Sequence, residues 1–199
     1  YTSEVARWFS VLLPIVKPLL RQNGGPVLMV QIENEYGFND ACDHEYMAWL
    51  RDETHRLLGK DTVIYTTDPS DVLKCGAVNG TLSTVDFGPT TRANVLKNFE
   101  RQKNYLPGGK GPLVNSEFYP GWFVQWGQHS QKLPSLILTL DTARAMYDAG
   151  ASFNVYMIYG GTNYGFWNGA ETNGAVITSY DYSAPITEGG NYTAAYFVL

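Results

Sequence analysis

Between residues 5 and 20, apolar side chains recur every three or four positions. This spacing places them on one face of an amphipathic helix. Pro14 and Pro18 are expected to bend or shorten the helix, and the Asn-Gly-Gly-Pro sequence at 23–26 is expected to end it. The chain is therefore predicted to open with one helix followed by a tight turn.

The next segment, 27–32, is almost entirely apolar and shows no alternation. Such a run is typical of a strand buried on both faces of a parallel sheet. It ends in the polar cluster Glu33-Asn34-Glu35. The alternation of helix and strand then continues along the chain. By the same criteria, helices are predicted over 43–58, 94–105 and 136–149, and strands over 63–65, 84–87, 112–115 and 153–159.

Helices and strands that alternate at this pitch indicate parallel βα units. Three of the predicted strands end in polar side chains, at Glu35, Glu117 and Asn163. Catalytic groups occupy this position, the carboxyl end of a strand, in a (β/α)8 barrel. The pattern holds about five strands, so we expect an α/β fold that is only the C-terminal portion of a (β/α)8 TIM barrel, about strands 4–8. The missing strands would precede Tyr1.

Composition narrows the classes of partner. The chain has 199 residues, of which 44% are hydrophobic, so one domain with a sizeable core is the default expectation. A net charge of −5 without a basic cluster argues against nucleic-acid binding. No apolar run approaches the roughly 20 residues that span a bilayer, so no membrane span is expected. The chain starts without a methionine or a signal segment, which suggests a piece of a longer protein.

Cysteines, histidines and sequons bear on cofactors and compartment. Cys42 and Cys75 are not in a Cys-x-x-Cys pair, and His44, His55 and His129 are too scattered for a metal set, so we expect neither a metal nor a cofactor. Two N-glycosylation sequons and an even number of cysteines favour a secretory-pathway protein with one disulfide bond, against the alternative of two buried thiols. The sequon asparagines are Asn79 and Asn191.

A carboxylate at the end of a buried strand costs free energy unless it is paired, hydrogen-bonded or used in chemistry. Glu35 and Glu117 both occupy such positions, and on one barrel face they would point into the same mouth. Glycoside hydrolysis uses this arrangement, with one protonated acid for the leaving oxygen and one ionised partner for the sugar carbon. The alternative is that both glutamates are structural hydrogen-bond acceptors that hold loops.

Other side chains near these positions have plainer interpretations. Glu33 suits hydrogen bonding inside the barrel better than chemistry. Asp68 and Asp86 end strands and are expected to orient neighbouring groups rather than to react. Trp126 and Trp167 either rim a pocket or lie outside it, because aromatic side chains stack on sugars but also gather in cores and interfaces.

Three blocks of sequence resemble glycoside hydrolase family 35, the family of the lysosomal-type β-galactosidases, and the likeness is closest to the animal acid enzymes. The first block, GGPVLMVQIENEYG, is a long and specific match. The blocks follow the family's order over nearly the whole chain. They lie at 24–37, at 115–119 with 121–122 and 126–127, and at 160–163 with 167–170 and 178–182.

The resemblance implies roles for individual residues. Glu35, the second glutamate of the Glu-Asn-Glu cluster, takes the role of proton donor and acid/base, and Glu117 takes that of nucleophile. Asn34 is expected to hydrogen-bond the 2-hydroxyl of galactose. Cys42 and Cys75 match the positions of the family's disulfide bond.

The resemblance also implies aromatic contacts with the substrate. Tyr182 is expected to touch the sugar or the nucleophile, with Tyr156 and Tyr180 close by, and Trp122 is expected to supply an apolar wall. Partners for the 4- and 6-positions of galactose are expected largely upstream of Tyr1.

The function implied is that of a retaining exo-β-galactosidase, which removes terminal β-D-galactose from galactosides, glycoconjugates or oligosaccharides through a covalent galactosyl-enzyme intermediate. Residues 1–199 would be a partial catalytic domain of a lysosomal or secreted protein, with a homodimer of the full-length chain left open. Alone, an open part-barrel exposes strand edges and is expected to be poorly stable and close to inactive. Alternatives are a sugar-binding relative without catalysis, a clan member acting on glucosamine or glucose, and a structural scaffold.

Overall fold

The computed structural model describes residues 1–128 and 133–199, and His129 lies outside the described residues. The chain divides into two compact units. The first comprises residues 1–86 and 98–113, and the second comprises residues 87–97 and 114–199. Helix α4 (Arg92–Lys103) begins in the second unit and ends in the first.

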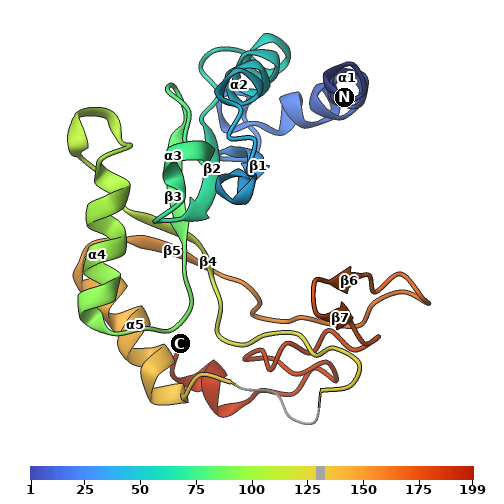
Figure 1. Cartoon of the computed structure of the whole chain (residues 1–199), viewed down its shortest axis with the longest axis vertical. Helices are drawn as coiled ribbons and strands as arrows, with labels where there is room; N and C mark the ends of the chain where they lie inside the picture. Colours follow the sequence, from blue (N-terminus) through green and yellow to red (C-terminus); the bar gives the residue numbers. More distant parts are fainter. Residues whose placement is uncertain (129–132) are drawn as a thin grey trace. The chain divides into compact units, whose positions relative to one another are not determined.

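Three parallel strands form the sheet of the first unit (Figure 1). Strand β1 (Val30–Asn34) pairs with β2 (Ile64–Pro69), which pairs in turn with β3 (Leu82–Asp86). The register of β1 on β2 shifts between Gln31 and Glu33, so the irregularity lies immediately before the polar end of the strand. Parallel pairing confirms the expectation of βα units.

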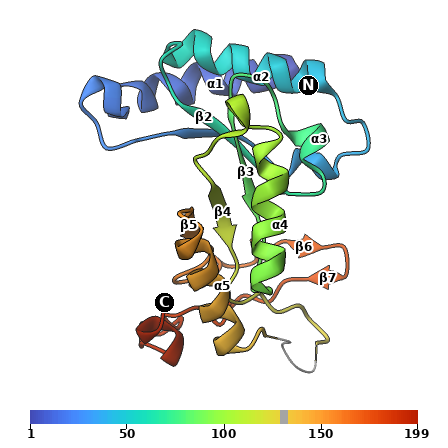
Figure 2. The same ribbon diagram turned by 90° about the vertical axis from the view of Figure 1, so that its left-hand side faces the viewer.

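Helices α1 (Thr2–Val16) and α2 (His44–Leu58) lie side by side in this unit (Figure 2). The short helix α3 (Leu73–Gly76) follows β2. Pro14 lies inside α1, and Pro18 falls in a 3-10 turn after its end, so the helix is shorter than its apolar pattern, as expected. Short 3-10 helices occupy Lys17–Leu19, Arg21–Asn23, Tyr36–Phe38, Pro107–Gly109 and Ala194–Phe197.

Helix α2 begins and ends where the sequence predicts. The Asp43 carboxylate accepts the backbone N–H groups of Glu45 and Tyr46, which have no partner inside the helix. Gly59 follows the last turn with φ of 108°, a value that favours glycine. One core cluster then joins this helix to the sheet. It contains Ile32, Met47, Leu50 and Ile64.

The strand predicted at 27–32 begins later than expected and is only partly buried. β1 starts at Val30, whereas Leu28 is 62% exposed and Met29 is 36% exposed. Ile32 is buried in the core. The expectation of burial on both faces is therefore wrong for the first half of the segment. The physical reason is that, in the described part of the chain, β1 has a strand neighbour on one side only.

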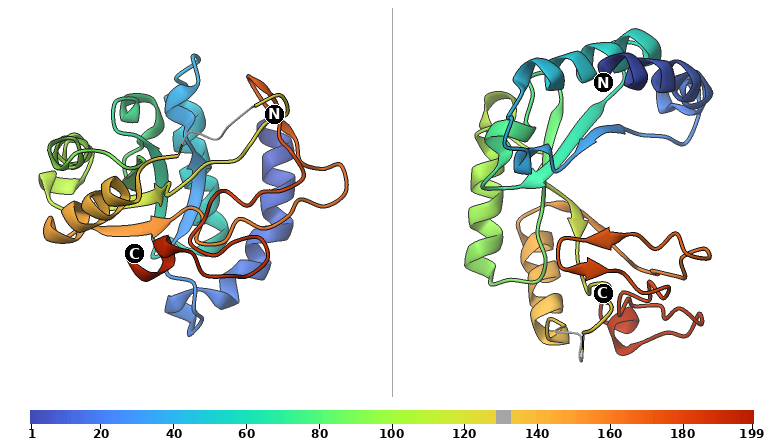
Figure 3. Two further views of the ribbon diagram at one scale, coloured as in Figure 1. Left: turned by 90° about the horizontal axis from the view of Figure 1, so that it is seen from below. Right: turned by 45° about the vertical axis from the view of Figure 1, so that its right-hand side comes forward.

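The second unit contains the parallel pair β4 (Val114–Phe118) and β5 (Ser152–Val155), together with helix α5 (Leu136–Asp148). Its remaining regular structure is the small antiparallel hairpin of β6 (Ala170–Glu171) and β7 (Gly174–Ala175) (Figure 3). Most of the chain after β5 is irregular, and isolated bridges and single backbone hydrogen bonds rather than a strand ladder connect its segments.

The last predicted strand, 153–159, ends early. Tyr156 still donates its backbone N–H to the Phe118 carbonyl at 2.8 Å, and the chain then turns. Tyr159 instead forms an isolated bridge with Ile186. The turn brings the segment after β5 beside the segment around residue 180, which no local sequence pattern predicts.

Candidate active site

Glu35 directly follows β1 and adopts a left-handed backbone conformation, with φ of 54° and ψ of 32°. Its N–H donates to the Thr67 carbonyl at 2.8 Å, and its carbonyl accepts from the Phe38 N–H at 3.1 Å. For a residue other than glycine this conformation costs about 1–2 kcal/mol, so surrounding contacts must impose it. Such outliers cluster at functional sites, and the half-buried Glu35 is a candidate for one.

Asn34 lies at the exposed end of β1. Its side-chain oxygen accepts from Gln31 Nε2 at 2.9 Å, and its backbone N–H donates to the Glu33 carboxylate. The Glu33 carboxylate is thus hydrogen-bonded locally, and its expected role inside the barrel stays a prediction. Hydrogen bonds therefore connect Gln31, Glu33 and Asn34 to one another, whereas the backbone of Glu35 is bonded to β2.

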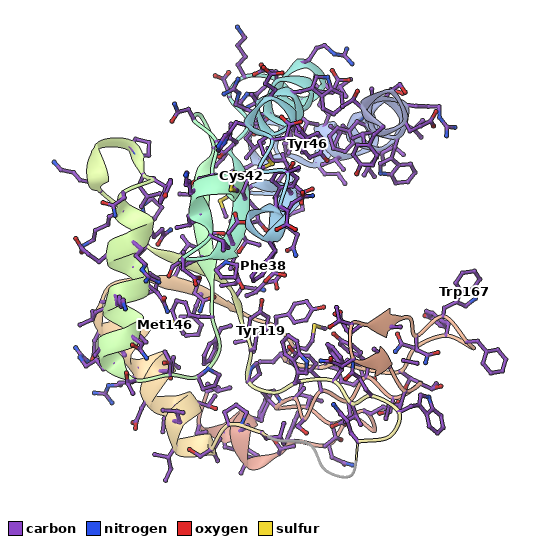
Figure 4. The ribbon with its side chains drawn as sticks, in the orientation of Figure 1. Phe38, Cys42, Tyr46, Tyr119, Met146 and Trp167 are labelled. Atoms are coloured by element: carbon purple, nitrogen blue, oxygen red, sulfur yellow. A yellow bond between two sulfur atoms is a disulfide. The ribbon has the colours of Figure 1, made fainter. Side chains whose placement is uncertain are left out.

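A cavity of about 560 Å³ lies in the first unit beside this cluster. Glu33 and Tyr36, which flank residues 34–35, both contribute to its lining. Tyr46 (Figure 4) and Trp49 also line it and stack on each other with ring centroids 6.4 Å apart. Because both rings also pack against the core of the unit, their expected core role and a place in the cavity wall coexist.

Cys42 and Cys75, the pair implied by the family resemblance, form a disulfide bond (Figure 4). Cys42 lies in the loop after the 3-10 helix Tyr36–Phe38, and Cys75 lies in α3. The bond therefore ties the segment that follows Glu35 to the segment that follows β2.

Glu117 lies within β4 and is half-buried. Its carboxylate oxygen Oε2 accepts a hydrogen bond of 2.9 Å from the Tyr119 hydroxyl, and its backbone N–H donates to Asn115 Oδ1 at 3.1 Å. Asn115 is fully buried and also donates to the Phe87 carbonyl. The glutamate is thus fixed at both its backbone and its carboxylate.

An aromatic cluster of Tyr119, Trp122, Tyr156, Tyr180 and Tyr182 gathers in the same unit. The ring of Tyr182 has centroid distances of 5.8 Å to Trp122, 5.8 Å to Tyr156 and 5.4 Å to Tyr180. The ring of Tyr119 lies 5.3 Å from Trp122. The structure thus brings together the four aromatic residues that the resemblance marked for substrate contact.

Burial and neighbouring charge affect the hydroxyls of this cluster. Burial raises the pKa of Tyr182 above its ordinary value, and the neighbouring Tyr180, Tyr156 and Glu117 raise it further. The pKa of Tyr180 is raised by burial first and then by its hydrogen bond with Tyr156. Tyr180 and Tyr182 are therefore neutral hydrogen-bonding groups near an acidic side chain.

Two glycines allow close approach of residues 180–182, which we call the tyrosine segment. A Cβ atom on Gly121 would lie 1.8 Å from the Tyr182 carbonyl oxygen, and one on Gly160 would lie 1.8 Å from the Tyr180 carbonyl oxygen. No larger residue fits at either position without displacing the backbone of the segment. These glycines belong to the second and third sequence blocks, which explains why those blocks contain them.

A polar network holds the same segment. The Glu188 carboxylate accepts hydrogen bonds from the hydroxyls of Ser179 and Thr162, which lower its pKa. The Glu188 backbone N–H donates to Asp181 Oδ2 at 2.7 Å, and Asp181 Oδ1 accepts from the Ser183 N–H at 3.2 Å. The residues of this network flank Tyr180 and Tyr182 in the sequence. The network was not predicted from the sequence.

Several predicted positions lie apart from the aromatic cluster. Trp126 is 72% exposed and Trp167 is 88% exposed, and neither ring belongs to the cluster. Their place at a pocket rim stays a prediction. The sequon residues Asn79 and Asn191 are both exposed.

Tyr119 is a contact that the sequence analysis missed. It follows Glu117 by two residues, and side chains two apart on an extended chain share a face, so this spacing could have revealed it.

The chain is an α/β protein with parallel strands, and a carboxylate lies at or near the carboxyl end of β1 and of β4. In (β/α)8 barrels, catalytic groups lie at such strand ends. The chain matches Glycosyl hydrolases family 35 over residues 1–199 and belongs to this family. It is 49% identical to a β-galactosidase of Homo sapiens and 48% identical to one of Macaca fascicularis, each over 205 aligned residues.

Those two matches cover 100% of this chain and 29% of each relative. The chain is also 43% identical to the β-galactosidase-1-like protein of Mus musculus over 204 residues, which covers 100% of the chain and 30% of that relative. The chain therefore spans less than a third of the length of these curated relatives.

Solved structures show a similar fold. A β-glucuronidase from an uncultured Clostridium sp. superposes with a TM-score of 0.59 at 13% identity, covering 98% of this chain and 35% of that chain. A fungal β-1,4-galactanase superposes with a TM-score of 0.54 at 13% identity, covering 96% and 67%. At this level of identity the likeness concerns the fold alone.

Proposed function

We propose that the full-length protein is a retaining exo-β-galactosidase and that this chain is the C-terminal portion, about strands 4–8, of its (β/α)8 barrel. The observation that carries the proposal is family membership over residues 1–199, together with 48–49% identity to curated β-galactosidases. A left-handed glutamate after β1 and a hydrogen-bonded glutamate in β4 support the assignment of Glu35 and Glu117 as its reacting groups.

The proposed reaction has two steps. Glu117 attacks the anomeric carbon while Glu35 transfers its proton to the glycosidic oxygen, so the bond to the leaving group breaks and a galactosyl ester forms. Glu35, now ionised, takes a proton from water, which attacks the anomeric carbon and releases galactose. Both glutamates return to their starting protonation states.

The surroundings suit these roles. The first step needs an ionised nucleophile, and the Tyr119 hydroxyl donates to the Glu117 carboxylate, which favours the charged form. Trp122, Tyr156 and Tyr180 would present ring faces to the sugar, and the buried Tyr182 packs against all three of these rings. Asn34, exposed at the end of β1, would hydrogen-bond the 2-hydroxyl.

The stereochemical outcome tests the mechanism. Retaining glycosidases keep their two carboxyl groups about 5–5.5 Å apart and inverting ones about 6.5–9.5 Å apart, so the two classes release opposite anomers. Proton NMR of the full-length protein with an aryl β-galactoside should show β-galactose as the first product. Release of α-galactose would contradict the double displacement.

A mechanism-based label tests class and residue together. A 2-fluoro-galactoside should leave a covalent adduct on the peptide that contains Glu117, detected by mass spectrometry. Glu117→Gln should abolish turnover and spare sugar binding. Binding of galactosides without any adduct would instead favour a sugar-binding protein, and stronger competition by glucose or glucosamine than by galactose would favour another member of the clan.

The remaining proposals concern the whole protein. We propose a lysosomal or secreted glycoprotein, since Asn79 and Asn191 are exposed and a disulfide bond is present. Enzymatic deglycosylation of the secreted protein should lower its mass by two glycans, and Asn79→Gln or Asn191→Gln should each remove one.

Assembly and the isolated chain can be measured directly. Light scattering of the full-length protein tests for a homodimer. Residues 1–199 expressed alone should be poorly soluble and close to inactive because β1 exposes an edge and apolar neighbours such as Leu28. Soluble expression with full activity would contradict this expectation.

A further inference from the structure

Asp68, near the end of β2, is hydrogen-bonded to the turn that carries Glu35. We call residues 35–38 the Glu35 turn. Asp68 Oδ1 accepts the Gly37 N–H at 2.6 Å, and the carbonyl of the preceding Thr67 accepts the Glu35 N–H at 2.8 Å. Two successive residues of β2 therefore hold the turn at two points, and one of these points is a side chain that can be changed.

The Asp68 carboxyl group is enclosed between two glycines. Asp68 has 0% exposure. A Cβ atom on Gly76 would lie 2.0 Å from Asp68 Oδ2, and one on Gly37 would lie 2.8 Å from Oδ1. The backbone of the Glu35 turn and the backbone of α3 thus pack directly on the carboxyl from separate segments.

The disulfide bond links those same two segments. Cys75 immediately precedes Gly76, and its partner Cys42 lies shortly after the Glu35 turn. The covalent bond limits the separation of the segments, and the buried Asp68 carboxyl occupies the space between Gly37 and Gly76. The left-handed backbone conformation of Glu35 needs such constraints, because it is unfavourable by itself.

The charge state of the carboxyl fits a structural role close to an acid. The pKa of Asp68 is raised to about 7 in total: burial is the largest cause, the hydrogen bond from Gly37 opposes the rise, and the negative charges of Glu33 and Glu35 add to it. Asp68 Oδ2 has no hydrogen-bond partner among the described residues. At acidic pH the group is therefore neutral and adds no further negative charge beside Glu35.

We propose that Asp68 is a positioning residue: its buried carboxyl, bound to the Gly37 N–H, holds the left-handed turn that presents Glu35 to the departing glycosidic oxygen. The inference rests on the proposed function, in which Glu35 is the acid/base. Asp68 itself touches no reacting atom. Its contribution is the orientation of Glu35, and a displacement of about 1 Å in such a group can cost about 100-fold in rate.

Two substrates separate positioning from general stability in the full-length protein. An alkyl β-galactoside has a poor leaving group and needs a proton from Glu35, whereas a dinitrophenyl β-galactoside leaves without one. For Asp68→Ala we expect kcat/KM to fall about 10- to 100-fold with the alkyl substrate and to stay within about 3-fold with the dinitrophenyl substrate. With the dinitrophenyl substrate kcat should still fall, because the second step needs Glu35 as a base. Azide replaces water in that step and should partly restore kcat.

The conservative variant and a matched control complete the test. Asp68→Asn keeps an oxygen acceptor for the Gly37 N–H and mimics the neutral acid, so it should restore the alkyl-substrate rate to within about 3-fold of wild type. Gln102→Ala removes another fully buried side chain, which donates to the Ser83 carbonyl away from the Glu35 turn. Gln102→Ala should lower the free energy of unfolding, but it should not make the change in kcat/KM differ between the two substrates.

Each outcome decides the inference. If Asp68→Ala lowers kcat/KM equally for both substrates, as a general loss of folded protein would, or for neither, Asp68 does not position Glu35. Glu35→Ala in the same assay tests the proposed function independently. If Glu35→Ala shows no difference between the substrates, the acid/base assignment fails; if only Asp68→Ala lacks that difference, the positioning role alone fails.

Discussion

The Tyr119 hydroxyl donates a hydrogen bond of 2.9 Å to Oε2 of Glu117, two residues earlier in the chain. The same tyrosine ring lies 5.3 Å from Trp122 and 6.1 Å from Tyr156. One side chain therefore joins the proposed nucleophile to the aromatic cluster. Its position depends on packing, since β4 ends at Phe118.

Removal of this hydroxyl should weaken the ionised form of Glu117. A hydrogen bond to a charged group is worth about 1.5–3 kcal/mol, so Tyr119→Phe should lower kcat/KM of the full-length protein about 10- to 100-fold. The loss should be largest at acidic pH, because ionisation of Glu117 then becomes limiting. Profiles of kcat/KM against pH measure this change.

Tyr147→Phe is the matched control, because this tyrosine on α5 is 76% exposed and distant in sequence from Glu117. Its profile should match that of wild type. An unchanged profile for Tyr119→Phe would show that the hydrogen bond has no role in the reaction.

Asp68 should make stability depend on pH. Its pKa is about 7 in the fold against an ordinary 3.8, so between these values the folded protein holds a proton that the unfolded chain has released. The stability contribution is fully present below about pH 4 and is lost as pH rises through about 7, by up to about 4 kcal/mol. Urea unfolding of the full-length protein at several pH values measures it.

Asp68→Asn should remove that component, because the amide does not titrate. Asp71→Asn, which changes an exposed carboxyl in the same unit, should keep the wild-type dependence. If wild type and Asp68→Asn respond to pH in parallel, Asp68 is ionised in the fold and its carboxyl has a partner that compensates its burial.

Gly121 should tolerate no side chain. A Cβ atom there would lie 1.8 Å from the Tyr182 carbonyl oxygen, which is backbone and cannot rotate away. Gly121→Ala should destabilise the protein by about 1–3 kcal/mol or more and raise KM, because the tyrosine segment moves.

Gly189→Ala offers the comparison, since its nearest neighbour would be an ordinary contact at 3.8 Å. It should leave both the urea midpoint and KM close to wild type. Equal effects of the two alanine substitutions would argue against a specific approach of Gly121 to Tyr182.

The disulfide bond closes a loop with a sequence separation of 33 residues. Replacing both cysteines by serine should lower the free energy of unfolding by about 3–4 kcal/mol, because the unfolded chain gains freedom. The urea midpoint of the double variant should equal that of wild type under reducing conditions. A stable double variant with an unchanged midpoint would contradict this expectation.

The sequence by itself determined the order and type of the main elements. Helix α2 lies where its apolar spacing, the Asp43 cap and Gly59 predict it, because these are local interactions within one turn of chain. The three sequence blocks also determined the family. Burial of 27–32 was predicted wrongly because an apolar run indicates that a segment is covered but not which element covers it. Leu28 is exposed in the described first unit.

Tertiary structure alone decided which side chains meet. Trp122, Tyr156 and Tyr182 come from segments well apart in sequence, and glycines without side chains let these segments approach. The enclosure of Asp68 between Gly37 and Gly76 is likewise invisible in any local pattern. Periodicity reports how each segment divides its own faces between core and water, whereas contacts between segments depend on how those faces pack together.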